Sequence, residues 1–126
     1  MEKKRILVID DESGFTKLLK LTLEKSGNYI VLEENTGVNA VAVAREFRPD
    51  LILLDVVMPK IDGGDVAAKI KSDPDLQKTP IVFLTAIISK REAKTVGHID
   101  GLPFISKPVS LEDLKQCIEE NLGGQA

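Results

Sequence analysis

The sequence predicts an α/β domain built on a doubly wound, mostly parallel sheet of five strands. Short apolar runs alternate five times with segments of helical period along the 126 residues. The third run, residues 51–54, contains no polar residue, which is typical of a strand covered by helices on both faces. The length suits a single hydrophobic core, so we expect one domain over residues 1–122 and a flexible tail or linker stub at 123–126.

Turn residues delimit the first two strand–helix units. Strands are expected at residues 6–9 and 29–32. Each precedes a helix with its apolar residues on one face: Phe15, Leu18, Leu19 and Leu23 in the first helix, and Val38, Val41, Ala42 and Phe47 in the second. Gly27 and Pro49 are expected to stop these helices.

A loop with two turn signals follows the third strand. Met58-Pro59 and Asp62-Gly63-Gly64 are interpreted as turns of that loop. A short helix then carries Val66, Ala67 and Ile70, and Ser72-Asp73-Pro74 breaks it.

The last two units are expected at strand residues 81–84 and 104–106. A helix with a thin apolar stripe is expected over 89–96, and His98 is expected in a surface loop after it. Pro103 fits an edge strand because proline lacks a backbone N–H. The final helix should begin after Ser110 as N-cap and place its apolar residues on one face: Leu111, Leu114, Cys117, Ile118 and Leu122.

Right-handed crossovers leave few ways to wind this alternation, and the flavodoxin-like strand order 2-1-3-4-5 is expected. In that order the first and third strands are neighbours at the switch point, where ligands bind. Because parallel strands gather their carboxyl ends at one edge, Asp10, Asp11 and Asp55 should meet there. Thr85 and Lys107 should approach from the fourth and fifth strands.

Composition and charge exclude several other classes of protein. The net charge is −3, whereas nonspecific nucleic-acid binding needs a basic stripe. No apolar stretch approaches the roughly 18 residues that span a bilayer. Cys117 is the single cysteine, so no internal disulfide can form. We expect a cytoplasmic protein that contacts neither nucleic acid nor membrane.

From Arg5 to about Leu122 the chain resembles the receiver domain of two-component response regulators. The resemblance is carried by short segments at successive strand ends: Val8-Ile9-Asp10-Asp11-Glu12, Leu54-Asp55-Val56-Val57-Met58-Pro59 with Asp62-Gly63, Leu84-Thr85-Ala86, and Lys107-Pro108. Each segment alone is a weak signal, but all of them in order are very specific. The resemblance implies a phosphoacceptor switch in a two-component phosphorelay.

In this resemblance Asp55 accepts a phosphoryl group from a sensor histidine kinase or a histidine phosphotransfer protein. Three adjacent carboxylates repel one another by roughly 4 kcal/mol per pair at 4 Å and an effective dielectric near 20. A divalent cation removes that penalty, and oxygen ligands without Cys or His favour Mg²⁺ or Mn²⁺. The expected direct ligands are Asp11, Asp55 and the Val57 carbonyl, with Asp10 acting through a water.

The family also implies a switch. Thr85 and Lys107 would contact the phosphoryl group, and a cis peptide bond before Pro108 would aim the lysine. When Thr85 moves, Phe104 would turn inward and change the surface of helix 4, strand 5 and helix 5 that a downstream partner or an output domain reads.

Two apolar residues stand at positions that tune phosphoryl lifetime in the family. Val57 lies two residues past the acceptor and Ile87 two past the switch hydroxyl. Neither can orient an attacking water, so we predict slow self-dephosphorylation. The chain is then a switch that catalyses only its own phosphorylation and dephosphorylation, rather than a turnover enzyme.

Three other functions fit parts of the pattern. A phosphatase of the haloacid dehalogenase type would carry Asp-x-Asp-x-Thr after the first strand, where this chain has Asp10-Asp11-Glu12-Ser13-Gly14. A flavin-binding module would need a hydroxyl-rich phosphate loop and stacking aromatics, which are missing. A degenerate receiver that binds partners without phosphorylation is disfavoured by the complete residue set. The cognate kinase, the signal and the output pathway are not encoded in these motifs.

Overall fold

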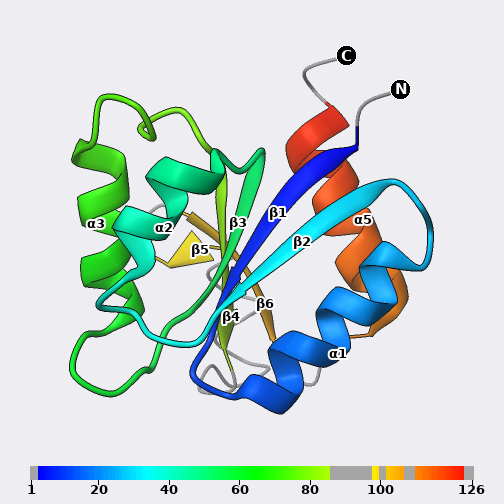
Figure 1. The fold of residues 1–126 in the computed structure, drawn as a ribbon, viewed down its shortest axis with the longest axis horizontal. Coiled ribbons are helices and arrows are strands. Elements are labelled where there is room, and N and C mark those ends of the chain that lie inside the picture. Colours follow the sequence, from blue (N-terminus) through cyan, green and yellow to red (C-terminus); the bar gives the residue numbers. More distant parts are fainter. Residues whose placement is uncertain (1–2, 86–97, 100–101, 107–109, 124–126) are drawn as a thin grey trace.

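The computed structural model describes residues 3–85, 98–99, 102–106 and 110–123 and has the predicted α/β architecture (Figure 1). The elements follow one another in this order: β1 (Lys4–Ile9), α1 (Ser13–Glu24), β2 (Tyr29–Glu34), α2 (Ala40–Phe47), β3 (Leu51–Asp55), α3 (Gly63–Ser72), β4 (Ile81–Thr85), β5 (His98–Ile99), β6 (Leu102–Ser106) and α5 (Leu111–Gly123). The helix expected over 89–96 lies outside the described residues. None of the helices in these ranges is long and apolar enough to cross a bilayer.

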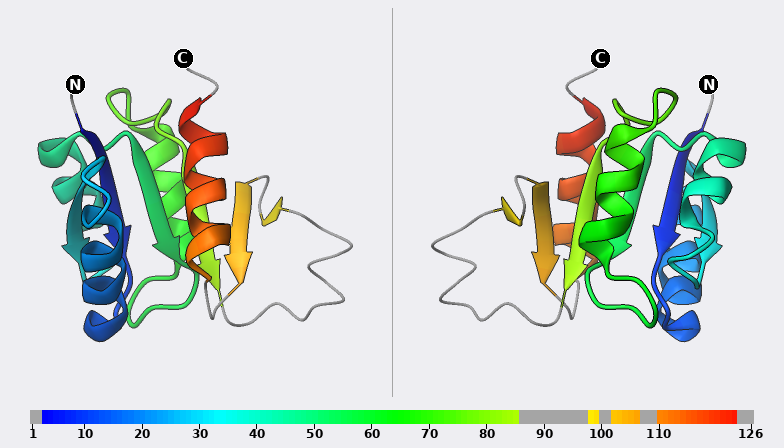
Figure 2. Two further views of the ribbon diagram at one scale, coloured as in Figure 1. Left: turned by 90° about the vertical axis from the view of Figure 1, so that its right-hand side faces the viewer. Right: turned by 90° about the vertical axis from the view of Figure 1, so that its left-hand side faces the viewer.

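Five parallel strands form the body of the sheet in the order β2-β1-β3-β4-β6, which confirms the predicted order 2-1-3-4-5. Their carboxyl ends lie at one edge, where the arrowheads in Figure 2 point. The register pairs Ile9 with Leu54, so β1 and β3 end together. The switch point therefore lies at this edge, between the first and third strands.

A sixth strand differs from the prediction. The two residues of β5 pair antiparallel to β6, with His98 opposite Pro103. The expectation of a loop at His98 is therefore wrong, and β6 is not the outermost strand. A strand of two residues is too short to show an alternating pattern, so the sequence carried no sign of it.

Two apolar cores lie on opposite faces of the sheet. Successive residues of a strand point to opposite faces, so Leu7 and Ile9 pack under α2 and α3 while Ile6 and Val8 pack under α1 and α5. Every residue of β3 is buried, as expected for a strand covered on both sides. Figure 1 shows α2 and α3 on one side of the sheet and α1 and α5 on the other.

Four residues expected in helix cores are exposed instead. Ala42 is exposed because α2 packs through Ala40 and Ala44. Leu18 is 61% exposed because α1 packs through Thr16, Leu19 and Leu23, and Leu18 lies about 100° round the helix from Leu19. Val38 precedes α2, which begins at Ala40. Leu111, 43% exposed, is the first residue of α5, which packs through Leu114, Ile118 and Leu122.

Several predicted boundaries are confirmed. Ser110 caps α5 by accepting a hydrogen bond from the Asp113 amide at 3.1 Å. Arg48, just before Pro49, ends α2 in the left-handed conformation with φ 55°. Gly27 has φ 83° in the turn after α1, where glycine is favoured.

Candidate functional site

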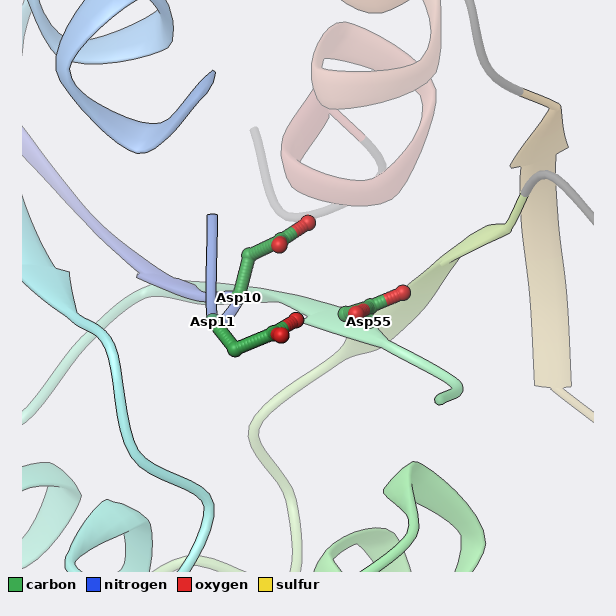
Figure 3. A group of neighbouring side chains, drawn as sticks. All are labelled: Asp10, Asp11 and Asp55. Carbon is green, nitrogen blue, oxygen red and sulfur yellow. The ribbon is translucent and has the colours of Figure 1, made fainter. Parts of the chain in front are cut away.

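Three carboxylates meet at the carboxyl edge of the sheet. Asp10 and Asp11 follow β1, and Asp55 is the last residue of β3. Carboxylate oxygens of the three residues lie within 4.8 Å of one another, and Figure 3 shows the side chains together beyond the strand ends. Asp10 is fully buried, Asp55 is 6% exposed and Asp11 is exposed. The cluster is therefore open to solvent on the side of Asp11.

A change of backbone direction brings the two consecutive acids to the same place. Neighbouring residues of an extended strand point to opposite faces, so a strand continuing through Asp11 would separate the two carboxylates. The β1–β2 ladder ends with the Asp10 amide donating to the Glu34 carbonyl at 3.1 Å. The Asp10 carboxylate then accepts a hydrogen bond from the Glu12 amide at 3.0 Å, which closes a tight turn around Asp11.

The backbone of Gly63 packs closely against the backbone of Asp55 and Val56. Gly63 donates its amide to the Val56 carbonyl at 2.7 Å. A Cβ added at Gly63 would lie 2.2 Å from the Asp55 carbonyl oxygen, a distance that no side chain allows. Only glycine therefore lets the start of α3 touch the backbone at the end of β3.

The glycine pair is helical rather than part of a turn. Gly63 and Gly64 are the first residues of α3, and Asp62 caps it by accepting from the Asp65 amide at 2.9 Å. The prediction of a turn at Gly63-Gly64 is wrong: turn propensity favours glycine in loops, whereas the close approach to Asp55 requires glycine at position 63 within the helix.

The donor atoms fit a hard divalent cation. The cluster offers carboxylate oxygens alone, and two of its three residues are almost completely buried. Like charges in such surroundings repel strongly, and a cation with oxygen ligands such as Mg²⁺ or Mn²⁺ would offset that repulsion. Asp11, the exposed member, lies where a ligand could enter from solvent. A cavity of about 400 Å³ borders it, lined also by Asn35, Pro59 and Lys60.

The other predicted site residues fall partly within the described structure. Val57 follows Asp55 by two residues and is 55% exposed. Thr85 is the last residue of β4, opposite Ser106 of β6. Phe104 is half-buried and packs against the core beneath α2 and α3. Ile87, Lys107 and Pro108 lie outside the described residues, so their roles stay predictions.

A polar network behind the acids was not predicted. It consists of Thr16 in α1, Glu33 at the end of β2 and Asn35 just after it. The Asn35 amide donates to the Asp10 carbonyl oxygen at 2.8 Å and to the Thr16 hydroxyl at 3.0 Å. The signal for Asn35 was available, since it is a polar residue at the carboxyl end of a strand, as the acids are. Thr16 gave no signal, because its burial depends on how α1 packs.

The sequence is similar to that of known proteins over most of its length. The model of the response regulator receiver domain family matches residues 6–119. A curated relative, the polar-differentiation response regulator DivK of Brucella anthropi, is 32% identical over 120 residues, which cover 95% of this chain and 97% of DivK.

Solved structures are similar over almost the whole chain. One is described as a response regulator of Chloroflexus aurantiacus, with 27% identity and a TM-score of 0.85, covering 97% of this chain and 99% of that one. Another is the receiver domain of a sensor histidine kinase from Pseudomonas aeruginosa, with 25% identity and a TM-score of 0.80 over 97% and 99% of the two chains. That receiver is described with a magnesium ion coordinated in its active-site cleft.

Proposed function

The chain belongs to the family of response regulator receiver domains, whose members are phosphoacceptors of two-component signalling, and we propose that Asp55 is its acceptor. The observation that carries the proposal is the meeting of Asp10, Asp11 and Asp55 within 4.8 Å at the switch point. Asp55 alone of the three closes a fully buried strand in the centre of the sheet. Its backbone is held there by the ladder and by Gly63.

The proposed reaction is a direct transfer between side chains. A carboxylate oxygen of Asp55 attacks the phosphorus of a phosphohistidine on a sensor histidine kinase or a histidine phosphotransfer protein. The P–N bond breaks as the P–O bond forms, and the imidazole leaves with its electron pair. The product is an acyl phosphate on Asp55, and we place this exchange in the cytoplasm.

The acids are proposed to hold Mg²⁺ through Asp11, Asp55 and the Val57 carbonyl, with Asp10 acting through a water. When bound, the cation supplies positive charge to the crowded carboxylates and to the phosphoryl oxygens. The chain itself holds the Asp55 backbone in the sheet and keeps Asp10 out of solvent. Thr85 and Lys107, with a cis bond before Pro108, are proposed to contact the phosphoryl group.

The proposed output is a change of surface rather than a product. Phe104 packs half-buried against the core beneath α2 and α3, one strand away from Thr85. Movement of Thr85 toward a phosphoryl group would let Phe104 turn further inward. A downstream protein or an output domain would read that change. The chain would thus act as a switch. Its domain is proposed to comprise residues 1–122.

Phosphorylation by a small donor tests the acceptor. The protein is incubated with Mg²⁺ and acetyl phosphate, and its intact mass is measured. Wild type should gain one phosphoryl group, whereas Asp55→Asn, with unchanged circular dichroism, should gain none. Omission of Mg²⁺ should abolish the gain. A phosphoryl group retained by Asp55→Asn would refute the assignment.

The lifetime of the acyl phosphate tests the two apolar positions. We propose that Val57 and Ile87 leave an attacking water unoriented, so that self-dephosphorylation is slow. After donor removal, the double variant Val57→Asn with Ile87→Glu should lose phosphate about 10-fold or more faster, as positioned polar groups commonly accelerate by such factors. Rapid loss in wild type that the double variant leaves unchanged would contradict this.

A further inference from the structure

Asn35 contacts the turn that brings the two acids after β1 to one site. It follows directly after β2 and is half-buried. Its side-chain nitrogen lies 2.8 Å from the Asp10 carbonyl oxygen and 3.0 Å from the Thr16 hydroxyl oxygen. A primary amide carries two hydrogens, so both bonds can form at once.

Three hydrogen bonds join Asp10 to the turn that follows β1 or to the end of β2 and the residue after it. Its amide donates to the Glu34 carbonyl, its carbonyl accepts from Asn35, and its carboxylate accepts from the Glu12 amide. The bond from Asn35 holds the peptide between Asp10 and Asp11, because the Asp10 carbonyl belongs to that peptide. The orientation of this peptide decides where the Asp11 side chain starts.

Thr16 and Glu33 anchor the other side of Asn35. Thr16 is fully buried, and its hydroxyl lies 2.8 Å from a Glu33 carboxylate oxygen and 3.1 Å from the Ser13 carbonyl. The hydroxyl has one hydrogen and accepts from Asn35, so the carboxylate of Glu33 is the stronger partner for that hydrogen. The bonds then run in one direction, from Asn35 to Thr16 to Glu33, and tie α1 to β2 behind the acids.

We infer that Asn35 is a positioning residue for the cation site, acting through the Asp10–Asp11 peptide and anchored by Thr16 and Glu33. The inference rests on the proposed function, since it concerns the same site. A ligand set held in place before the cation arrives binds more tightly than one that must be ordered on binding. Loss of the two Asn35 bonds should therefore weaken cation binding without removing any ligand.

Asn39 supplies a matched control. It is also an asparagine of the β2–α2 connection, it lines the same cavity beside Asp11, and its side chain makes no capping hydrogen bond. Asn39 is exposed, so its replacement by alanine makes the same chemical change near the site and leaves the Asn35 bonds to Asp10 and Thr16 in place.

The experiment is a titration with Mn²⁺, in which electron paramagnetic resonance measures the free ion. Asn35→Ala should raise the Kd about 10-fold, equivalent to about 1.4 kcal/mol. Asn39→Ala should change it less than about 2-fold. Thr16→Val keeps the side-chain volume and removes the hydroxyl, and should raise the Kd about 3-fold, as it loosens Asn35 but leaves its bond to Asp10.

Thermal unfolding without divalent cations separates positioning from general stability. A structural role alone would lower the melting temperature of Asn35→Ala and leave the Kd unchanged at a temperature where all variants are folded. Equal Kd values for Asn35→Ala and Asn39→Ala would overturn the inference. Should Asn35→Ala not fold, an unchanged Kd in Thr16→Val would overturn it instead.

Failure of the proposed function has a different signature. If wild type does not bind Mn²⁺, or if Asp11→Asn and Asp55→Asn bind it as wild type does, the cation site itself is wrong. If those two variants lose binding while Asn35→Ala binds normally, the cation site stands and the role of Asn35 is refuted.

Discussion

A buried aspartate lies near each end of α3, and the two carboxylates have opposite electrostatic surroundings. At its start, Gly63 touches the backbone of Asp55, which meets Asp10 and Asp11. At its end, the side chain of Asp73 is 3% exposed and pairs with the Arg45 guanidinium of α2. Asp73 also accepts from the Asp75 amide at 2.9 Å. One end gathers like charges, whereas the other pairs a single charge with a cation of its own chain.

The difference separates a charge that is paired within the fold from charges that are proposed to bind a cation. The Asp75 amide, and then Arg45, hold the pKa of Asp73 below its ordinary value of 3.8 despite the opposing effect of burial. Such an aspartate stabilises the fold with no ligand. The acid cluster is instead proposed to bind a cation, which would stabilise the protein, because binding to the native state alone favours that state. Divalent ions are therefore expected to stabilise the protein through the cluster of Asp10, Asp11 and Asp55, and not through the Arg45–Asp73 pair.

The largest effect is expected from a substitution that breaks the contact between Gly63, at the start of α3, and the Asp55 backbone. Gly63→Ala places a Cβ 2.2 Å from the Asp55 carbonyl oxygen, so either α3 or β3 must shift. We expect a loss of about 3 kcal/mol in the free energy of unfolding, measured by urea denaturation. Gly14→Ala is the control, since a Cβ there meets nothing within 4 Å. Equal stability of the two variants would show that the tight approach does not exist.

Smaller effects of opposite sign on the free energy of unfolding are expected for Asp11→Asn and Asp73→Asn. In EDTA, Asp11→Asn should raise the free energy of unfolding by about 1 kcal/mol, because one of three like charges is removed from a partly exposed cluster. It should also lose most of the stabilisation that Mg²⁺ gives wild type. Asp73→Asn should be destabilised and should keep the full response to Mg²⁺, as thermal melts with and without the ion will show. The same sign for both variants in EDTA would contradict the comparison.

The smallest expected signal is a pH dependence at the Arg45–Asp73 end. A lowered native pKa means that Asp73 contributes stability fully above its unfolded value near 3.8, and that this contribution is lost as the pH falls through the lower native value. The difference in melting temperature between wild type and Asp73→Asn should be constant from about pH 7 to 5 and shrink below about pH 4. Arg45→Met should reproduce part of the change. A difference that grows in acid would reverse the assigned sign.

Most of the fold followed from local patterns. Unbroken apolar runs marked β1, β3 and β4, and chirality then left few windings, so the order 2-1-3-4-5 was predictable. That Asp55 lies beside the acids after β1 follows from the same reasoning, because neighbouring parallel strands end together, whereas the meeting of Asp10 with Asp11 also requires the turn closed by the Glu12 amide.

Packing explains the parts that were missed. Leu18 has the same hydropathy as Leu19, and only the rotation of α1 on the sheet leaves it 61% exposed. The helical Gly63 depends on its distance to the Asp55 carbonyl, and no propensity encodes that distance. The bond from Asn35 to Asp10 joins residues 25 positions apart and forms only once β1 and β2 are paired.

The chain's order of apolar runs, turn residues and strand-end acids was enough to specify the layers, the strand order and the place of the acid cluster. These depend on periodicity and handedness, which act over a few residues and are legible along the chain. The buried state of Thr16, the close contact at Gly63 and the network that reaches Asp10 required the folded molecule. They arise from distances between elements remote in sequence, which exist only after the helices have packed against the sheet.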